Sequence, residues 1–351
     1  LNPSSAASDV YKRQAWLLNN EAWRDISHFK AALPRMDVLH RFSFIDLPIR
    51  GQWVRLENSL AEATQFRVYP KPIHEMLGQM LAAVAMVADN IKFSGAVTLQ
   101  SRGDGDLLRS LAECKDQSFL RGIMHLQNPD NHAIDEQPLA QWLGNGQLAL
   151  SLIPDKESGM QPYQGFVSLE YDTLAQCLEH YFVTSEQLET CLNFASDSSA
   201  KAPSVTGLLL QRLPNNPQAT EIEIDAARDA WHTLTTLAAT VTDEELSQLD
   251  AQTLLYRLFH EHPCRLHEPR ALSYRCSCSR EKTDTTLMML GSEDLSALIE
   301  EQSEITVDCE FCGNRYTYDR DSATKVLTDL EEQTTAANPA GASSDDLKTL
   351  H

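Results

Sequence analysis

The feature that most constrains this chain is a pair of cysteine motifs near its C-terminal end. Cys276 and Cys278 form a C-x-C motif, thirty residues intervene, and Cys309 and Cys312 form a C-x-x-C motif. Four thiolates match the tetrahedral, soft-ligand preference of zinc, at about 2.3 Å each. Residues i and i+2 of an extended chain point to the same side, so both sulfurs of the C-x-C motif can reach one metal. The spacing predicts one zinc ion per chain in the reduced protein, bound by these four cysteines.

The residues that follow the C-x-x-C motif favour a zinc knuckle over a thioredoxin-like site. Gly313 and Asn314 tolerate the tight turn that lets both sulfurs face inward. Tyr316 and Tyr318 then alternate as in a strand. A thioredoxin-like C-x-x-C would instead open a helix after a strand.

Spacing alone favours an inert structural zinc, because that is the larger class of four-cysteine sites. Two features weaken this interpretation. The two cysteines of each motif are close enough in sequence for oxidation to join them without help from the fold. Residues 276–312 also carry nine acidic and two basic side chains, so we expect the segment to unfold easily without zinc. A domain whose folding energy is largely metal binding is a switch if the metal can be lost.

Two other groups could bind metal or react, and in both we favour a structural interpretation. The first consists of scattered cysteines that we expect in a core: Cys114, Cys177 and Cys191. The second has ligand-like spacing: His260, His262, Cys264 and His267. Because four cysteines already saturate a tetrahedral zinc, we interpret the second group as the solvated end of a helix. No catalytic Ser/His/Asp set, phosphate loop or dinucleotide motif is present in the sequence, so no catalytic residue is predicted.

The pattern before the cysteines predicts an α+β protein with a mixed sheet-and-helix core over residues 36–213. Helical spacing of apolar residues predicts helices over 73–92 and 173–182, with 185–192 as a further candidate. Alternation and turn signals predict strands over 95–100, 148–153 and 165–169. The cysteine motifs then fall in a small C-terminal zinc-binding domain, residues 269–330.

A helical linker, residues 214–268, is predicted between these two parts. It follows a proline-containing break, carries nine acids and two bases over 219–262, and shows no strand pattern. Thr242 with Glu245 forms a capping box, and Asp250 can cap the next helix. If the zinc domain covers or supports this linker, the following apolar residues are exposed only after oxidation: Leu246, Leu249, Leu254, Leu255, Leu258 and Phe259.

Composition and the chain ends limit the function further. The net charge is −21, which disfavours phosphate backbones and therefore nucleic acid as a partner. The longest apolar run, residues 80–88, is too short to span a bilayer, so no membrane association is predicted. No secretory signal is visible in 1–35, an extension that we expect outside the fold, so we expect a reducing compartment. Residues 331–351 have the composition of a disordered tail.

With these motifs in place, residues 36–330 resemble the redox-regulated heat-shock protein 33 chaperone family. The resemblance rests first on residues 274–281 and 309–314, which match the family's C-x-C and C-x-x-C signature. Core segments are similar too: residues 39–42, 103–105, 143–146, 163–165, 172–175, 177–182 and 185–188. Glu189 stands where the family pattern has a proline.

The resemblance implies a cytoplasmic, ATP-independent holdase and not an enzyme. In the reduced form, zinc bound through Cys276, Cys278, Cys309 and Cys312 keeps the protein inactive. Oxidation forms two disulfides among these cysteines, releases zinc and melts the C-terminal domain and the linker. Exposed apolar surface then binds unfolded client proteins, and the active form is a homodimer. The residues that bind clients cannot be named from the sequence.

Two other functions compete with this one. A static zinc ribbon in a protein-binding module would keep its metal under oxidants. A thiol–disulfide oxidoreductase would cycle one cysteine pair without melting its domain, but it needs a thioredoxin-like pattern that the sequence lacks.

Overall fold

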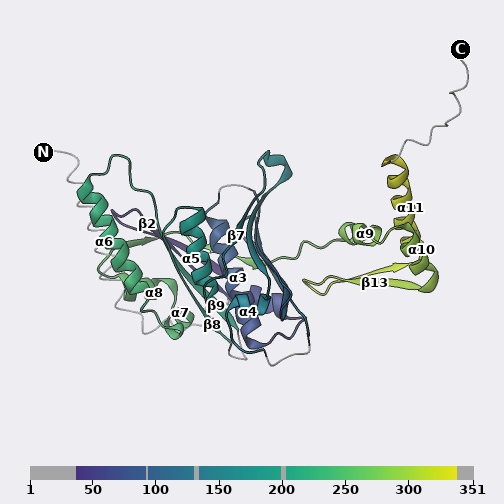
Figure 1. The fold of residues 1–351 in the computed structure, drawn as a ribbon, viewed down its shortest axis with the longest axis horizontal. Coiled ribbons are helices and arrows are strands. Elements are labelled where there is room, and N and C mark those ends of the chain that lie inside the picture. The colour runs from purple at the N-terminus through teal and green to yellow at the C-terminus, as the bar shows by residue number, and fades with distance from the viewer. Residues whose placement is uncertain (1–36, 92–93, 130–133, 199–202, 338–351) are drawn as a thin grey trace, which may run out of the picture. The chain divides into compact units, whose positions relative to one another are not determined.

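A computed structural model of the chain describes residues 37–91, 94–129, 134–198 and 203–337. The extension predicted at 1–35 lies outside these ranges, as do residues 338–351 of the predicted tail. Within them the fold is α+β, as predicted: two mainly antiparallel sheets, helices on and between them, and a small C-terminal region with its own hairpin (Figure 1).

Sheet A contains six strands of the described chain, all in antiparallel pairs. Their order is β10 (Cys264–Leu266), β1 (Val38–Phe44), β2 (Ile49–Leu56), β9 (Ser204–Arg212) and β8 (Thr190–Asp197), with β11 (Arg270–Ala271) also paired with β1. Side chains alternate across this sheet. Trp53 and Leu208 face one apolar cluster, whereas Val54 and Leu209 face another, so both faces of sheet A are covered.

Sheet B is a second set of six strands among the residues described. The order is β12 (Ser273–Tyr274), β5 (Phe119–Leu126), β4 (Leu107–Lys115), β3 (Gly95–Arg102), β6 (Gln147–Pro154) and β7 (Tyr163–Val167). Every pair is antiparallel except β12 with β5. The short 3₁₀ helix η2 (Lys156–Ser158) lies between β6 and β7.

Helix α3 (Lys71–Asp89) lies between the sheets and packs against strands of both (Figure 1). Its residues 80–88 are buried on all sides, which explains why the longest apolar run belongs to an internal helix. Shorter helices complete this core: α2 (Asn58–Thr64), α4 (Leu139–Leu143) and α5 (Leu174–Ser185). No helix of the described residues is long and apolar enough to cross a membrane.

The predicted linker forms three helices on the face of sheet A that points away from α3 (Figure 1). These are α6 (Glu221–Ala238), α7 (Asp243–Gln248) and α8 (Ala251–Phe259). The Thr242 capping box and the Asp250 cap are both present, as predicted. The apolar positions of α7 and α8 pack with Phe42, Phe44 and Trp53 of sheet A. The buried apolar residues of the linker helices therefore pack against sheet A of the core, which is the cover that the sequence interpretation sought in the cysteine-bearing domain.

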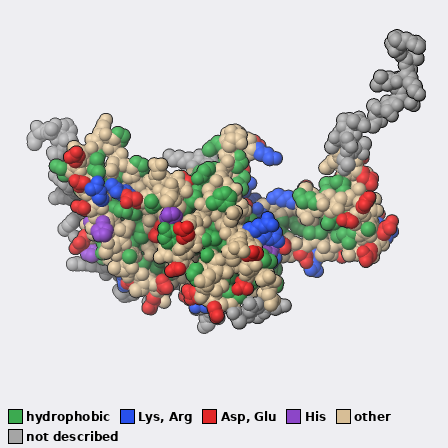
Figure 2. Space-filling view, viewed as in Figure 1, with side chains coloured by type: hydrophobic (Ala, Val, Ile, Leu, Met, Phe, Trp, Pro, Cys, Tyr) green, Lys and Arg blue, Asp and Glu red, His purple; other side chains and the backbone are tan. Residues whose placement is uncertain are grey.

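The C-terminal region consists of α9 (Arg280–Met288), α10 (Ser292–Glu301), the hairpin β13 (Glu304–Asp308) with β14 (Arg315–Asp319), and α11 (Arg320–Ala337). Its separate apolar cluster is small: Leu287, Leu295, Ile299, Ile305, Tyr318, Ala323 and Val326. Acidic side chains gather on its surface (Figure 2). Helix α11 continues to Ala337, so residues 331–337 are helical, where the sequence predicted a disordered tail.

Most of the predicted core elements are present within a few residues, with one exception. The candidate helix at 185–192 is wrong, because α5 ends at Ser185 and β8 begins at Thr190. Gln187 has a positive φ of 56°, which turns the chain between them. Pairing with the buried strand β9 along the whole of β8 outweighs the local helical pattern.

Candidate metal centre

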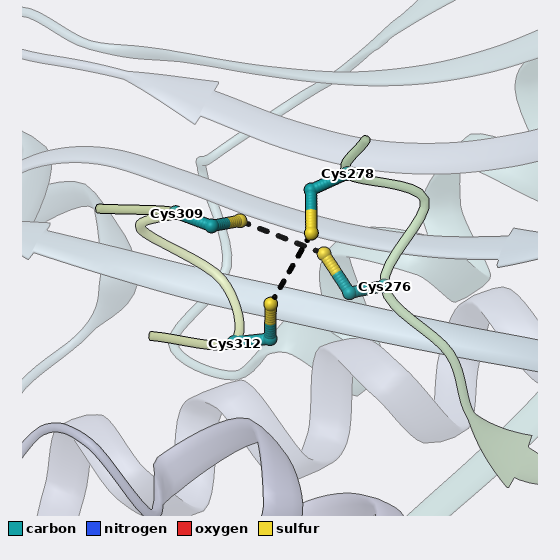
Figure 3. A group of neighbouring side chains, drawn as sticks. All are labelled: Cys276, Cys278, Cys309 and Cys312. Atoms are coloured by element: carbon teal, nitrogen blue, oxygen red, sulfur yellow. Dashed lines mark hydrogen bonds between the residues drawn. The ribbon is translucent and has the colours of Figure 1, made fainter. Parts of the chain in front are cut away.

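Two loops bring the four motif cysteines together (Figure 3). Cys276 and Cys278 lie on the chain between β12 and α9. Cys309 and Cys312 lie in the turn that joins β13 to β14. The residues in between fold back through α9 and α10, and the small C-terminal apolar cluster fixes this return. The buried Tyr318 contributes a further tie, because its hydroxyl donates to Asp284 Oδ1 at 2.6 Å.

The turn of the hairpin follows from its sequence. The Cys309 N–H donates to the Asn314 carbonyl, and the Gly313 N–H donates to the Cys309 carbonyl, both at 2.8 Å. Gly313 has a φ of +66°, a left-handed conformation that favours glycine. Arg315 pairs with Asp308 through two contacts, at 2.8 and 2.9 Å, and closes the hairpin at the next residue pair. This is the tight turn that the sequence predicted after the C-x-x-C motif.

The spacing of the sulfurs suits one tetrahedral metal ion. The four Sγ atoms all lie within 4.8 Å of one another. Cys276 and Cys309 approach to 3.6 Å, and Cys278 and Cys312 to 3.4 Å. A tetrahedron with metal–sulfur bonds of about 2.3 Å has edges of about 3.8 Å, so small adjustments would seat zinc at its centre. The donor set is all sulfur, which selects a soft ion such as zinc over magnesium or calcium.

One thiol of the centre is polarised toward the thiolate. The Tyr316 hydroxyl donates to Cys278 Sγ at 3.1 Å. Burial would raise the pKa of the Cys278 thiol, but the hydrogen bonds from Tyr316 and the neighbouring cysteines outweigh it and lower this pKa to about 7. Burial raises the pKa of the Cys276 thiol. The thiolate is the form of cysteine that binds metal and acts as a nucleophile. Because its pKa is the lower of the two, Cys278 is more readily ionised than Cys276 and better suited to both roles. The sequence interpretation treated Tyr316 only as a strand residue.

A second residue that the sequence did not indicate is Arg121 of β5. Its Nη1 donates to Ser277 Oγ at 2.8 Å, and its guanidinium lies over the Phe311 ring, 4.7 Å from the centroid. Ser277 separates the C-x-C cysteines and Phe311 lies within the C-x-x-C motif, so one side chain contacts both loops. Arg121 is itself fixed by a bidentate pair with Glu113, at 2.7 and 2.9 Å.

Further contacts join the loops to the core. The Tyr274 hydroxyl donates to the Phe311 carbonyl at 2.7 Å. Arg67 donates to the Glu310 carbonyl at 3.3 Å. A Cβ at Gly313 would lie 2.8 Å from the Phe66 ring, so the loop passes directly over that side chain. The metal centre is therefore attached to sheet B and to the chain after α2.

The second ligand-like cluster does not come together as a metal site. Among the residues that the structure describes, the four motif cysteines form the one group with metal-binding geometry. Cys264 lies in β10, and His267 Nε2 contacts Ser43 Oγ at 3.1 Å. His260 follows α8 as its C-cap, with His262 just beyond, as expected for the end of a helix.

The remaining cysteines are structural in their placement. Cys114 and Cys177 are fully buried in the main core, and Cys191 and Cys264 pack against the cluster under the linker helices. Burial raises the pKa of Cys114 to about 12 and that of Cys191 and Cys264 to about 11. Such thiols are poorly ionised near neutral pH and are weak nucleophiles. The prediction of core packing for Cys114 and Cys177 is confirmed.

Fold and site together define an α+β protein with a group of four cysteines, contributed by two loops, that could hold a metal ion. A model of the family described as Hsp33 protein matches residues 37–319. A 33 kDa chaperonin of Pseudomonas aeruginosa strain UCBPP-PA14 is 38% identical over 299 residues, which cover 85% of this chain and 96% of the relative. The chain belongs to the Hsp33 family, and it is a chaperone and not an enzyme.

Other relatives agree with this placement. A 33 kDa chaperonin of Neisseria meningitidis serogroup A is 39% identical over 290 residues, 83% of this chain and 91% of the relative. The crystal structure of a 33 kDa chaperonin from Thermotoga maritima matches with a TM-score of 0.68 at 20% identity. The match covers 84% of this chain and 99% of that one, and it supports the fold.

Proposed function

We propose that the chain is a redox-regulated, ATP-independent holdase whose reduced form binds one zinc ion through Cys276, Cys278, Cys309 and Cys312. The observation that carries the proposal is the convergence of four sulfurs within 4.8 Å in a region with only a small apolar cluster. Structural zinc contributes on the order of 10 kcal/mol to the folding of such regions, comparable with the stability of a whole domain. Metal binding then decides whether this region is folded.

Oxidation is the proposed trigger. Peroxide takes two electrons from each cysteine pair and is reduced to water, so two equivalents join all four sulfurs in two disulfides. Disulfide sulfurs no longer carry the charge that binds a cation, and zinc is released. We propose the pairs Cys276–Cys278 and Cys309–Cys312, because the two cysteines of each motif are close enough in sequence to bridge without help from the fold. In the folded region each sulfur also has a neighbour in the other motif, so peptide mapping is needed to identify the pairs.

The proposed domains follow from this switch. Residues 36–213 are the core and dimerisation domain, 214–268 the linker, and 269–330 the zinc-binding domain. Loss of zinc melts the last two and exposes apolar surface to unfolded client proteins, with a homodimer as the active form and the cytoplasm as its location. The surface acidity keeps the opened protein soluble. The net charge of −21 also argues against nucleic acid as a partner.

The decisive experiment measures metal, thiols and chaperone activity on the same samples. Reduced protein should contain one zinc per chain and should not suppress aggregation. Peroxide with mild heat should release zinc, remove four free thiols, raise the binding of an apolar dye and suppress aggregation of an unfolding protein. Retention of zinc under oxidant would favour a static zinc ribbon. Equal activity of the reduced and oxidised forms would leave a constitutive chaperone with a structural metal.

A further inference from the structure

The end of the linker is an extended segment that covers the outer edge of sheet A. This edge segment, residues 263–272, runs along β1 through β10 and β11. The Ile45 N–H donates to the Pro263 carbonyl at 2.9 Å, and the Leu272 N–H donates to the Asp37 carbonyl at 2.9 Å. Between these ends, the His267 N–H donates to the Arg41 carbonyl at 2.8 Å. The edge segment therefore pairs with both ends of β1 and has a short break between β10 and β11.

The edge segment binds the core as an alternating strand. Cys264 and Leu266 pack against the apolar cluster that contains Phe42 and Phe44. The alternate residues Arg265 and His267 are exposed. The site therefore accepts an antiparallel strand that presents apolar side chains at every second position, and the backbone supplies the remaining contacts.

We propose that β1 is a client-docking edge, and that the edge segment occupies it as an internal strand until oxidation releases it. The occupant that fits is an extended, alternating apolar segment of an unfolding polypeptide. This inference rests on the proposed function, since both ends of the edge segment continue into parts that are proposed to melt: α8 before it and the metal centre after it. An unpaired strand edge is a ready template for another chain.

The same argument does not apply to the edge of sheet B, where β12 pairs with β5. β12 covers only the first two residues of β5. Further along β5, the Tyr69 hydroxyl accepts from the Met124 N–H at 3.1 Å and donates to the Met124 carbonyl at 3.2 Å. Tyr69 precedes α3 in the core and stays in place when the linker melts. The edge of β5 thus remains blocked, and the inference is confined to β1.

Backbone hydrogen exchange of the full-length protein tests the release. Exchange in residues 38–45 should be slow in the reduced, zinc-loaded form, faster after oxidation, and slow again when a client is bound. The central strand β3 is the internal control, because β4 and β6 cover both its edges in all three states. Unchanged protection of β1 on oxidation would overturn the inference. Protection of β1 that rises with protein concentration without client would also overturn it, since a second copy would then fill the edge.

A peptide experiment tests the kind of occupant. The probe is a labelled peptide with the sequence of residues 262–268 and Cys264→Ser, which prevents disulfide exchange. The matched control carries N-methyl groups on the nitrogens of Arg265 and His267, so its side chains are identical but two edge donors are missing. The probe should bind the oxidised form and not the reduced form. The control should bind about 5- to 150-fold more weakly, as expected for the loss of two backbone hydrogen bonds.

The outcomes separate this inference from the proposed function. Absence of probe binding to the oxidised form, or equal binding of probe and N-methylated control, rejects β1 as a strand-docking edge. Aggregation suppression by the oxidised form can persist in that case, and the holdase proposal then stands without it. Probe binding is scored without any client, so it reports on the edge even if the protein suppresses no aggregation.

Discussion

Arg121 offers the sharpest test of how the metal centre depends on the core. Its side chain contacts both cysteine loops, through Ser277 and Phe311. Replacement by methionine removes these contacts, but it also leaves the Glu113 carboxylate, 13% exposed, without its partner. The informative comparison is therefore Glu113→Gln/Arg121→Met against Glu113→Gln alone, because the single variant keeps the contacts to both loops.

The magnitude follows from the two contacts. A hydrogen bond from a charged donor contributes about 1.5–3 kcal/mol, and a cation–π contact about 0.5–1 kcal/mol. The Arg121 side chain is 20% exposed, so solvent weakens both contacts. We therefore assign about 2 kcal/mol to the hydrogen bond with Ser277 and the cation–π contact with Phe311 together. If the loops make these contacts only when folded around the metal, the whole loss appears in zinc affinity. The double variant should bind zinc roughly 30-fold more weakly than its control.

Competition with a chromogenic zinc chelator measures this ratio, and far-UV circular dichroism verifies that the core of both variants is folded. Thiol oxidation by peroxide should be faster in the double variant, because its thiolates are released from metal more often. Equal zinc affinity in the two variants would refute the reasoning. It would mean that the cysteine loops fold around the metal independently of sheet B.

Three further predictions concern the cysteines and the linker. Measurement of metal content should find one zinc per chain in Cys264→Ser and none in Cys278→Ser. Zinc loss in the first variant would instead support a metal site formed by Cys264 and the neighbouring histidines. After chelation of zinc, alkylation followed by mass spectrometry should label the four motif cysteines first and Cys114 last, since Cys114 is fully buried in the main core; early labelling of Cys114 would contradict its placement. Phe259→Ala, which removes a ring packed edge-to-face on β1 with centroids 5.2 Å apart, should destabilise linker docking by about 3–5 kcal/mol and speed proteolysis within 239–262 in the reduced form. The matched control Tyr256→Ala, on the exposed side of the same helix, should change proteolysis little, and equal effects would argue against the packing.

The grouping of the four cysteines could be predicted from the sequence because the two motifs are local and chemically distinctive. Two cysteines two residues apart and two more three residues apart allow few arrangements other than a shared metal. Arg121 could not be predicted, because it lies 156 residues from Ser277 and reaches it only through the folding of sheet B. An arginine in a strand carries no local signal for such a contact.

In the linker, too, local features could be predicted from the sequence but contacts with distant residues could not. Its caps and apolar positions could be predicted, since a capping box is a local pattern. An amphipathic pattern gives the buried face of a helix but not its partner, and the partner is sheet A. The strands β10, β11 and β12 were not predicted, because two or three residues are too few for alternation to be recognised.

Release of the edge segment from β1 requires the ion pair between Arg270 and Asp89 to break, and the free-energy cost of this step must be small enough for release to occur. Its Nε lies 3.0 Å from Oδ1 of Asp89, whose side chain is fully buried. Breaking a buried ion pair costs about 3–5 kcal/mol when one charge is left without partners. Here Asp89 keeps partners in the core, because Gln52 donates to its Oδ2 at 2.8 Å and Arg41 lies 3.8 Å from the same oxygen. The Asp89 carboxylate therefore keeps a hydrogen bond and a nearby positive charge when Arg270 leaves. The free-energy cost of separating this ion pair is then below about 3–5 kcal/mol. If zinc binds as proposed, it contributes on the order of 10 kcal/mol, and metal binding would stabilise the closed edge segment more than this ion pair does.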